Sequence, residues 1–293
     1  MRTTVRSFPA LAALAFTLLS AHPAYAIAHG TNAPDGAYRF SVRLTMTGLP
    51  TADHGTRDSW CSGALVAPEW VITAGHCFRD RDGRRVSRPV AARTTATIGR
   101  TDLNGRDGHE VEVVEVEQSS TADVALARIK TAVTDIVPLP IESGPPAVGS
   151  VIRLTGYGLT DDTTAAATRR LQTGQFTVDR IGDSTVAASG RSPSEWTSPC
   201  LHDSGGPYFE QRAEGGPALV AVVSTGPGCP HPGSDFGARV DNLAAWIAAT
   251  TDADGAGWLG SRTALGLGGF ALLAALIVTI TAVRRRLVTA EAQ

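Results

Sequence analysis

The chain has 293 residues, a formal net charge of −2 at pH 7 and a hydrophobic fraction of 43%. This length can hold one large domain or two modest ones with hydrophobic cores. The slightly acidic balance argues against a nucleic acid partner, which would call for a basic surface. Arginine provides nearly all of the positive charge because Lys130 is the single lysine, a bias consistent with GC-rich coding in a bacterium.

The first 26 residues have the pattern of a secretory signal peptide. Arg2 and Arg6 precede an apolar run from Leu11 to Leu19, and Ala24-Tyr25-Ala26 matches an A-x-A cleavage site. The apolar run is too short to cross a bilayer core of about 30 Å. We therefore expect cleavage after Ala26 and export of the chain.

A second apolar segment lies near the C-terminus. Residues 263–283 carry no charge, are long enough to span a membrane as a helix, and are followed by Arg284-Arg285-Arg286. Because such arginines prefer the cytoplasmic side, we expect the preceding chain at the extracellular face, with the membrane as a partner. A buried C-terminal helix is the alternative, and the oligomeric state is left open. The expected divisions are a signal peptide (1–26), an extracellular domain (27–250), a linker (251–262), a transmembrane helix (263–283) and a cytoplasmic tail (284–293).

Short β-type runs bounded by Gly, Pro and Asp occupy the middle of the chain. Such runs without helical periodicity between them predict an all-β barrel or sandwich. One helix is expected at Asp241–Ala249, with Leu243, Trp246 and Ile247 on one side. The predicted strands are Phe40–Leu44, Ala64–Val66, Val71–Thr73, Glu110–Glu117, Val151–Leu154, Gln175–Val178 and Leu219–Val223.

Neither the carboxylates nor the cysteines predict a metal site. The near-alternation of Glu110–Glu117 is typical of a half-buried strand with a solvated acidic face. The four cysteines are widely spaced and lack a C-x-x-C pair, which disfavours zinc. In an exported chain they predict two disulfides, for which three pairings are possible. We expect no metal and no cofactor.

Two motifs carry the chemistry, Thr73-Ala74-Gly75-His76-Cys77 and Asp203-Ser204-Gly205-Gly206-Pro207. A serine hydroxyl is a poor nucleophile unless an imidazole takes its proton and a carboxylate orients the imidazole. The glycines allow a tight turn that aims backbone N–H groups at a developing oxyanion. Asp123 leads into an apolar strand, where burial of its carboxylate calls for a hydrogen bond such as the imidazole N–H. The motifs predict a serine protease with His76, Asp123 and Ser204 as its catalytic residues.

These motifs and their order resemble the trypsin/chymotrypsin family, over a stretch from Ile27 to about Thr250. Gly156-Tyr157-Gly158 and Ser224-Thr225-Gly226 are similar to the family's Gly-Trp-Gly and Ser-Trp-Gly. The resemblance implies two six-stranded antiparallel β-barrels ending in a helix, and a protein or peptide as substrate. It also implies the pairings Cys61–Cys77 and Cys200–Cys229.

Two departures from the family pattern bear on catalysis. His202 stands where the family has a glycine that donates an oxyanion N–H, together with Ser204. A β-carbon disfavours the required conformation, and losing one donor slows such enzymes about 10² to 10³ fold. Histidine keeps a backbone N–H, which is compatible with weak or substrate-restricted activity, and its ring has room to crowd the leaving-group side. Thr225 removes an aromatic wall beside the substrate strand.

The resemblance also implies an activation pair. In the family, a new N-terminal isoleucine folds inward and its amine pairs with the aspartate before the serine. Here these residues are Ile27 and Asp203. Cleavage after Ala26 releases Ile27 directly, so we expect export itself to activate the enzyme.

The implied substrate-binding residues are Ser198, Ser224, Gly226 and Asp235, with Ser224 and Gly226 on the strand that pairs with the peptide. Ser198 stands at the base of the primary pocket and, being uncharged, is similar to the apolar-preferring branch. Asp235 either places a carboxylate in the pocket, which favours Arg or Lys in the substrate, or is a solvated loop residue. The sequence leaves both alternatives open.

The expected function is that of an exported, membrane-anchored serine endopeptidase that works through an acyl-enzyme. The alternative is a catalytically weak or silent homologue that uses its barrels for binding, motivated by His202 and Thr225. An esterase is disfavoured because the chain lacks the usual G-x-S-x-G elbow.

Overall fold

The computed structural model describes residues 27–161, 168–212 and 214–252. The expected signal peptide, transmembrane helix and tail lie outside these ranges, as does all but the start of the linker. Within the described ranges, no helix is both long and apolar enough to cross a membrane.

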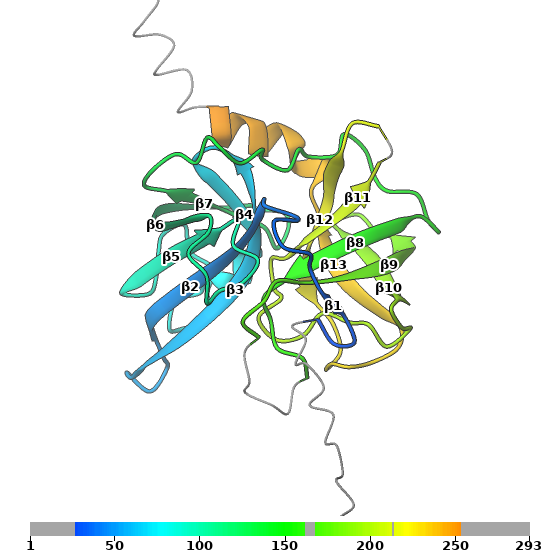
Figure 1. The fold of residues 1–293 in the computed structure, drawn as a ribbon. Helices are drawn as coiled ribbons and strands as arrows, with labels where there is room; N and C mark the ends of the chain where they lie inside the picture. Colours follow the sequence, from blue (N-terminus) through cyan, green and yellow to red (C-terminus); the bar gives the residue numbers. More distant parts are fainter. Residues whose placement is uncertain (1–26, 162–167, 213, 253–293) are drawn as a thin grey trace, which may run out of the picture.

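The first half of the chain forms a closed antiparallel barrel (Figure 1). Alternate residues of its strands point inward, as in β2, where Val42, Leu44 and Met46 are buried. These side chains meet Val113 and Val116 of β6 in one apolar cluster. In order around the barrel the strands are β2 (Ser41–Pro50), β3 (Thr56–Ala67), β4 (Trp70–Thr73), β7 (Ala125–Ile129), β6 (His109–Gln118) and β5 (Arg93–Ile98).

The second half forms a second ring of six strands. β8 pairs with both β9 and β11, which closes the ring, and the short β1 (Thr31–Asn32) adds to β9. The strands in order are β8 (Val151–Gly156), β9 (Gln172–Ile181), β10 (Thr185–Ser192), β13 (Ser234–Arg239), β12 (Pro217–Thr225) and β11 (Pro207–Gln211).

A shared apolar cluster joins the two barrels. Phe40 and Phe209 meet edge to face with ring centroids 5.2 Å apart. After the 3₁₀ turn Asp241–Leu243, a helix over residues 244–252 begins, and its Ile247 packs into the same cluster. Figure 1 shows this helix in orange, beside the end of the barrels where β7 and β11 lie. The predicted all-β architecture with two barrels and a terminal helix is confirmed.

The predicted strands overlap seven of the observed strands and miss others. Phe40 alone lies outside, one residue before β2 begins. The other predicted residues lie within β2, β3, β4, β6, β8, β9 and β12. β10 and β13 were not predicted because Gly190, Asp235 and Gly237 are typical of loops. Pairing between these two strands supplies the backbone hydrogen bonds that their composition does not predict.

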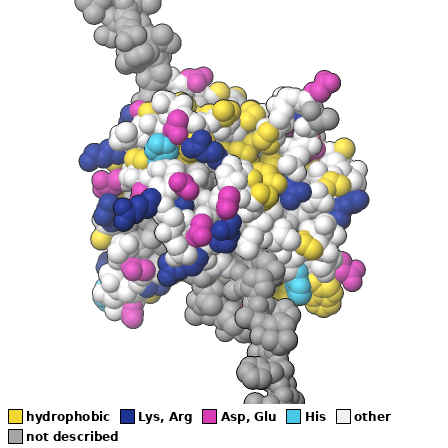
Figure 2. All heavy atoms as spheres, viewed as in Figure 1, with side chains coloured by type: hydrophobic (Ala, Val, Ile, Leu, Met, Phe, Trp, Pro, Cys, Tyr) yellow, Lys and Arg dark blue, Asp and Glu magenta, His cyan; other side chains and the backbone are white. Residues whose placement is uncertain are grey.

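Acidic and basic side chains are interspersed on the face in Figure 2. Among the described residues, ion pairs at the surface include Arg39–Asp135 and Arg84–Asp80, each with nitrogen and oxygen 3.1 Å apart. Exposed pairs of this kind contribute little stability, so the fold rests on its apolar clusters.

Candidate active site

His76 and Asp123 are brought together by the pairing of β4 with β7. Thr73 lies opposite Ala125, so the 3₁₀ turn Gly75–Cys77 after β4 lies beside the residues that lead into β7. His76 Nδ1 is 2.7 Å from Asp123 Oδ2, and the backbone N–H of His76 donates to Oδ1 at 2.8 Å. The carboxylate therefore fixes the imidazole and leaves Nε2 free to act as a base.

The second barrel also stabilises the Asp123 carboxylate. Ser224, near the end of β12, donates its hydroxyl to Oδ2 at 2.7 Å, and Arg85 Nη1 lies 3.7 Å from Oδ1. Burial by itself raises the pKa of Asp123. The hydrogen bonds from His76 and Ser224 and the charge of His76 together outweigh burial, and the pKa falls to about 2. Asp123 is thus an anion at neutral pH. No sequence motif pointed to Arg85.

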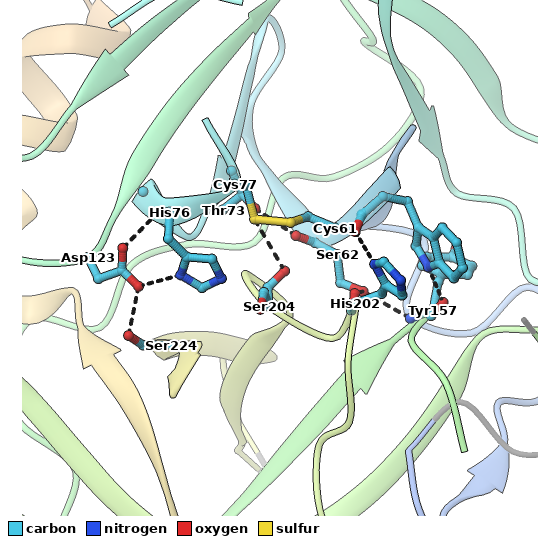
Figure 3. The surroundings of a disulfide bond; sticks show 12 residues. Cys61, Ser62, Thr73, His76, Cys77, Asp123, Tyr157, His202, Ser204 and Ser224 are labelled. Atoms are coloured by element: carbon cyan, nitrogen blue, oxygen red, sulfur yellow. Dashed lines mark hydrogen bonds and ion pairs between the residues drawn. A yellow bond between two sulfur atoms is a disulfide. The ribbon is translucent and has the colours of Figure 1, made fainter. Parts of the chain in front are cut away.

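Ser204 lies in a loop held between the barrels. Its carbonyl accepts the N–H of Ser62 in β3 at 2.9 Å, and Gly205 N–H donates to Val223 O of β12 at 2.8 Å. Gly205 has φ +82°, and a β-carbon there would collide with Thr73 Oγ1, so the turn requires glycine. Figure 3 shows the imidazole of His76 between Asp123 and Ser204. His76 and Ser204 line one cleft of about 640 Å³.

His202 adopts the left-handed conformation expected of a glycine, with φ +76°. Its ring stacks on Trp60, with centroids 3.6 Å apart and planes 18° apart. Nδ1 lies 2.7 Å from Trp60 O, so it carries the proton and donates it. The ring is therefore anchored to β3 on one side of the cleft. Sequence reasoning placed His202 at the oxyanion loop, and no signal pointed to Trp60 as its partner.

The carbonyl of His202 is held as well. Ser62 Oγ donates to His202 O at 3.1 Å and accepts the N–H of Tyr157 at 2.9 Å (Figure 3). Burial has the largest effect on the His202 imidazole and lowers its pKa. The hydrogen bond to Trp60 raises the pKa by less, so the net shift is downward. The ring is neutral at pH 7.

Ile27 and Asp203 are both fully buried. Ile27 is fully buried in the cluster that includes Ile152 and Phe176, and Ala28 exchanges backbone hydrogen bonds with Ser198. Asp203 is fully buried and accepts the N–H groups of Gly158 and Cys200, at 2.9 and 3.0 Å.

No ion pair within the described residues involves Asp203. Burial raises its pKa well above the usual range of a carboxyl, against the two backbone hydrogen bonds. A cation placed at this carboxylate would relieve the penalty of burying it.

The two disulfides implied by the resemblance are present. Cys61–Cys77 joins β3 to the turn that carries His76, and Cys200–Cys229 joins the Ser204 loop to the segment after β12. Each bond ties an element of the cleft to the barrel beside it.

Asp235 is buried, so of the two alternatives left open by the sequence, the solvated loop residue is wrong. Its exposed fraction is 1%, because β13 pairs with both β10 and β12 and turns the side chain inward. Ser198 is buried nearby, and its hydroxyl accepts the N–H of His231 at 3.4 Å. Ser224–Gly226 lie at the surface end of β12, where an extended peptide has access. Sequence reasoning missed His231, although its place between Cys229 and Asp235 is a signal.

Two antiparallel barrels with serine, histidine and aspartate at their junction define a chymotrypsin-like serine protease domain. The sequence profile of the family described as "Trypsin" matches residues 27–247. The chain belongs to the trypsin family.

Curated relatives include "Serine protease 56" of Homo sapiens and of Mus musculus, 30% and 29% identical over 236 residues. Each match covers 71% of this chain but 35% of the relative, so the chain spans about a third of their length. "Glucanase inhibitor protein 2" of Phytophthora infestans is 25% identical over 72% of this chain and 85% of its own length. "Snake venom serine protease homolog 2" of Macrovipera lebetinus is 35% identical over 38% of this chain and 44% of its own length. These relatives give the expected bacterial origin no support.

Proposed function

We propose that this chain is an exported serine endopeptidase whose nucleophile, base and orienting carboxylate are Ser204, His76 and Asp123. The observation that carries the proposal is the 2.7 Å contact between His76 Nδ1 and Asp123 Oδ2, beside a cleft that His76 and Ser204 both line. That contact determines which imidazole nitrogen faces the serine.

The proposed reaction follows from these positions. Ser204 Oγ attacks the peptide carbonyl carbon while His76 Nε2 takes the hydroxyl proton, and the N–H groups of His202 and Ser204 stabilise the oxyanion. The imidazolium then gives its proton to the leaving amine as the C–N bond breaks, which produces an acyl-enzyme. Water, deprotonated by His76, hydrolyses that ester and restores Ser204. Ser224 and Gly226 pair with the peptide backbone beside the cleft.

Activation is proposed to accompany export. Removal of residues 1–26 leaves the amine of Ile27, and this ammonium pairs with the buried Asp203, which lacks an ion pair among the described residues. Residues 263–283 then hold the domain at the extracellular face of the membrane through the linker 251–262, with residues 284–293 inside the cell. N-terminal sequencing of the fully active exported protein checks this, and a start other than Ile27 would contradict it.

A second candidate is a weak or silent homologue that acts by binding. The positive φ of His202 favours this candidate. The names of two relatives favour it as well, because one is called a protease homolog and the other a glucanase inhibitor. The test is reaction of the exported protein with a fluorophosphonate. The peptidase labels at Ser204, and Ser204→Ala abolishes the label. An unlabelled wild type that starts at Ile27 would instead establish the silent homologue.

A further inference from the structure

A His–Asp pair, separate from the catalytic residues, lies beside Gly226 at the strand end proposed to bind the peptide. Asp235 Oδ1 is 3.2 Å from His231 Nε2, and both side chains are nearly buried. A β-carbon on Gly226 would collide with the same Oδ1, so the carboxylate lies directly behind the strand end proposed to bind the peptide. Gly226 is two residues beyond Ser224, which contacts Asp123. The pair is thus close to the site of peptide cleavage.

The hydrogen bonds of the pair determine how many protons it holds. His231 Nδ1 lies 3.0 Å from Pro232 O, and a carbonyl only accepts, so Nδ1 carries a hydrogen. Nε2 faces a carboxyl oxygen, and this contact requires one proton between the two groups. The pair is therefore either imidazolium with carboxylate or imidazole with carboxylic acid. In both forms its net charge is zero, and loss of the proton leaves it at −1.

One oxygen of Asp235 is left without a partner. Oδ2 is buried and accepts no hydrogen bond among the described residues, an arrangement that is unfavourable for a buried polar group. A guanidinium or ammonium group would supply both the missing donor and a compensating charge. An uncharged side chain supplies neither, but it tolerates the neutral, protonated pair.

The other ionisable groups that act on Asp235 are few. Asp203 on the serine loop and Tyr208 on β11 both interact with it electrostatically, and neither supplies a cation. Burial raises the pKa of Asp235 to about 6, against the charge and hydrogen bond of His231, which lower it. The proton is therefore exchangeable near neutral pH.

We propose that His231 is a specificity-determining residue whose proton, shared with Asp235, competes with a basic substrate side chain for the primary pocket. With the proton bound, the pocket accepts uncharged residues before the scissile bond. When the proton leaves, Asp235 accepts Arg or Lys. This inference deepens the proposed peptidase function and rests on it for its substrate, but the competition can be measured without catalysis.

The test uses benzamidine, a flat amidinium cation, and the full exported chain carrying Ser204→Ala. Calorimetry in two buffers of different ionisation enthalpy gives the number of protons released on binding. At pH 6, near the pKa of Asp235, we expect about half a proton per benzamidine, rising to about one at pH 5, and an affinity that rises up to about tenfold per pH unit until the pair is deprotonated. Binding without proton release at pH 6, or with an affinity that does not change with pH, would overturn the proposal.

Three further substitutions in the same background separate the roles. Asp235→Asn removes the charge at constant shape, so benzamidine binding should weaken at least tenfold and release no proton. His231→Gln keeps a donor but removes one of the two sites for the proton. It should change the benzamidine affinity at pH 6 by at least threefold together with the proton release, and unchanged affinity and proton release would refute the role of His231. The matched control is His109→Gln, which disrupts an exposed His–Asp pair elsewhere, with His109 Nε2 2.7 Å from Asp135 Oδ1. This variant should leave benzamidine affinity and proton release unchanged.

Catalysis provides an independent readout if Ser204 reacts. Two peptides are compared that differ only in having Arg or Leu before the scissile bond. Both depend on His76 in the same way, so its contribution cancels in the ratio of their kcat/KM values. The ratio should rise with pH in the wild type and stay low and constant in Asp235→Asn. Failure to label Ser204 would refute the proposed peptidase and leave the benzamidine result to decide on the pocket.

Discussion

Replacement of His202 tests how the oxyanion loop is stabilised. The left-handed backbone at φ +76° costs a residue with a β-carbon about 1–2 kcal/mol. The hydrogen bond from Nδ1 to Trp60 O contributes about 1 kcal/mol, and the stack on Trp60 contributes about 1 kcal/mol more. The side chain therefore roughly offsets the strain of its own backbone.

Alanine and glycine separate these contributions. His202→Ala loses both contacts and keeps the strain, so its free energy of unfolding should fall by about 2 kcal/mol. His202→Gly loses the same contacts but relieves the strain, at an entropic cost of about 0.5–1 kcal/mol, so it should be more stable than the alanine variant by about 0.5–1 kcal/mol. Urea unfolding measures both. An alanine variant as stable as wild type, or more stable than the glycine variant, would refute the reasoning.

Acid provides a second check on the same ring. Because the pKa of His202 is lowered in the folded protein, the unfolded chain takes up this proton first as pH falls. The stabilisation by His202 is thus complete above its unfolded pKa of about 6.5 and declines below it. The penalty of His202→Ala should therefore shrink between pH 7 and 5, and a penalty that grows on acidification would contradict a neutral ring.

Two further substitutions probe the junction of the barrels. Ser224→Ala removes one hydrogen-bond donor to Asp123, so the pKa of Asp123 should rise from about 2. The free energy of unfolding at pH 7 should fall by about 1–2 kcal/mol. Because the folded pKa is depressed, this contribution is present above about pH 4 and disappears as pH falls towards 2, which urea unfolding across that window measures. Unchanged acid unfolding would mean that the Ser224 contact contributes nothing. Gly205→Ala forces a β-carbon onto Thr73 Oγ1 at φ +82°, so it should destabilise the fold by about 3 kcal/mol and abolish fluorophosphonate labelling. A stable, fully labelled Gly205→Ala protein would show that the turn tolerates a side chain.

Much of the candidate site could be predicted from the sequence because its reactive groups lie in short, contiguous motifs. The motifs around His76 and Ser204 contain both the reactive groups and the glycines that their turns need. The place of Asp123 before an apolar strand indicated the carboxylate, and the resemblance then implied both disulfides and the two barrels. The strands β10 and β13 were missed, since pairing between them outweighs residues that are typical of loops.

The environment of individual residues depended on contacts between distant segments. His202 was predicted as a weak point, but only the fold brings Trp60 of β3 against its ring, 142 residues away in sequence. Asp235 could be a pocket carboxylate or a solvated residue, and the register of β13 with β10 and β12 buries it against His231.

The sequence by itself determined the reactive groups, their order and the glycine turns, because these depend on side-chain chemistry and local backbone freedom. Only the tertiary structure decided which polar groups are buried together and which lack partners. Burial and pairing change the energy of a charge by several kcal/mol, and both are set by neighbours that the chain supplies from far away.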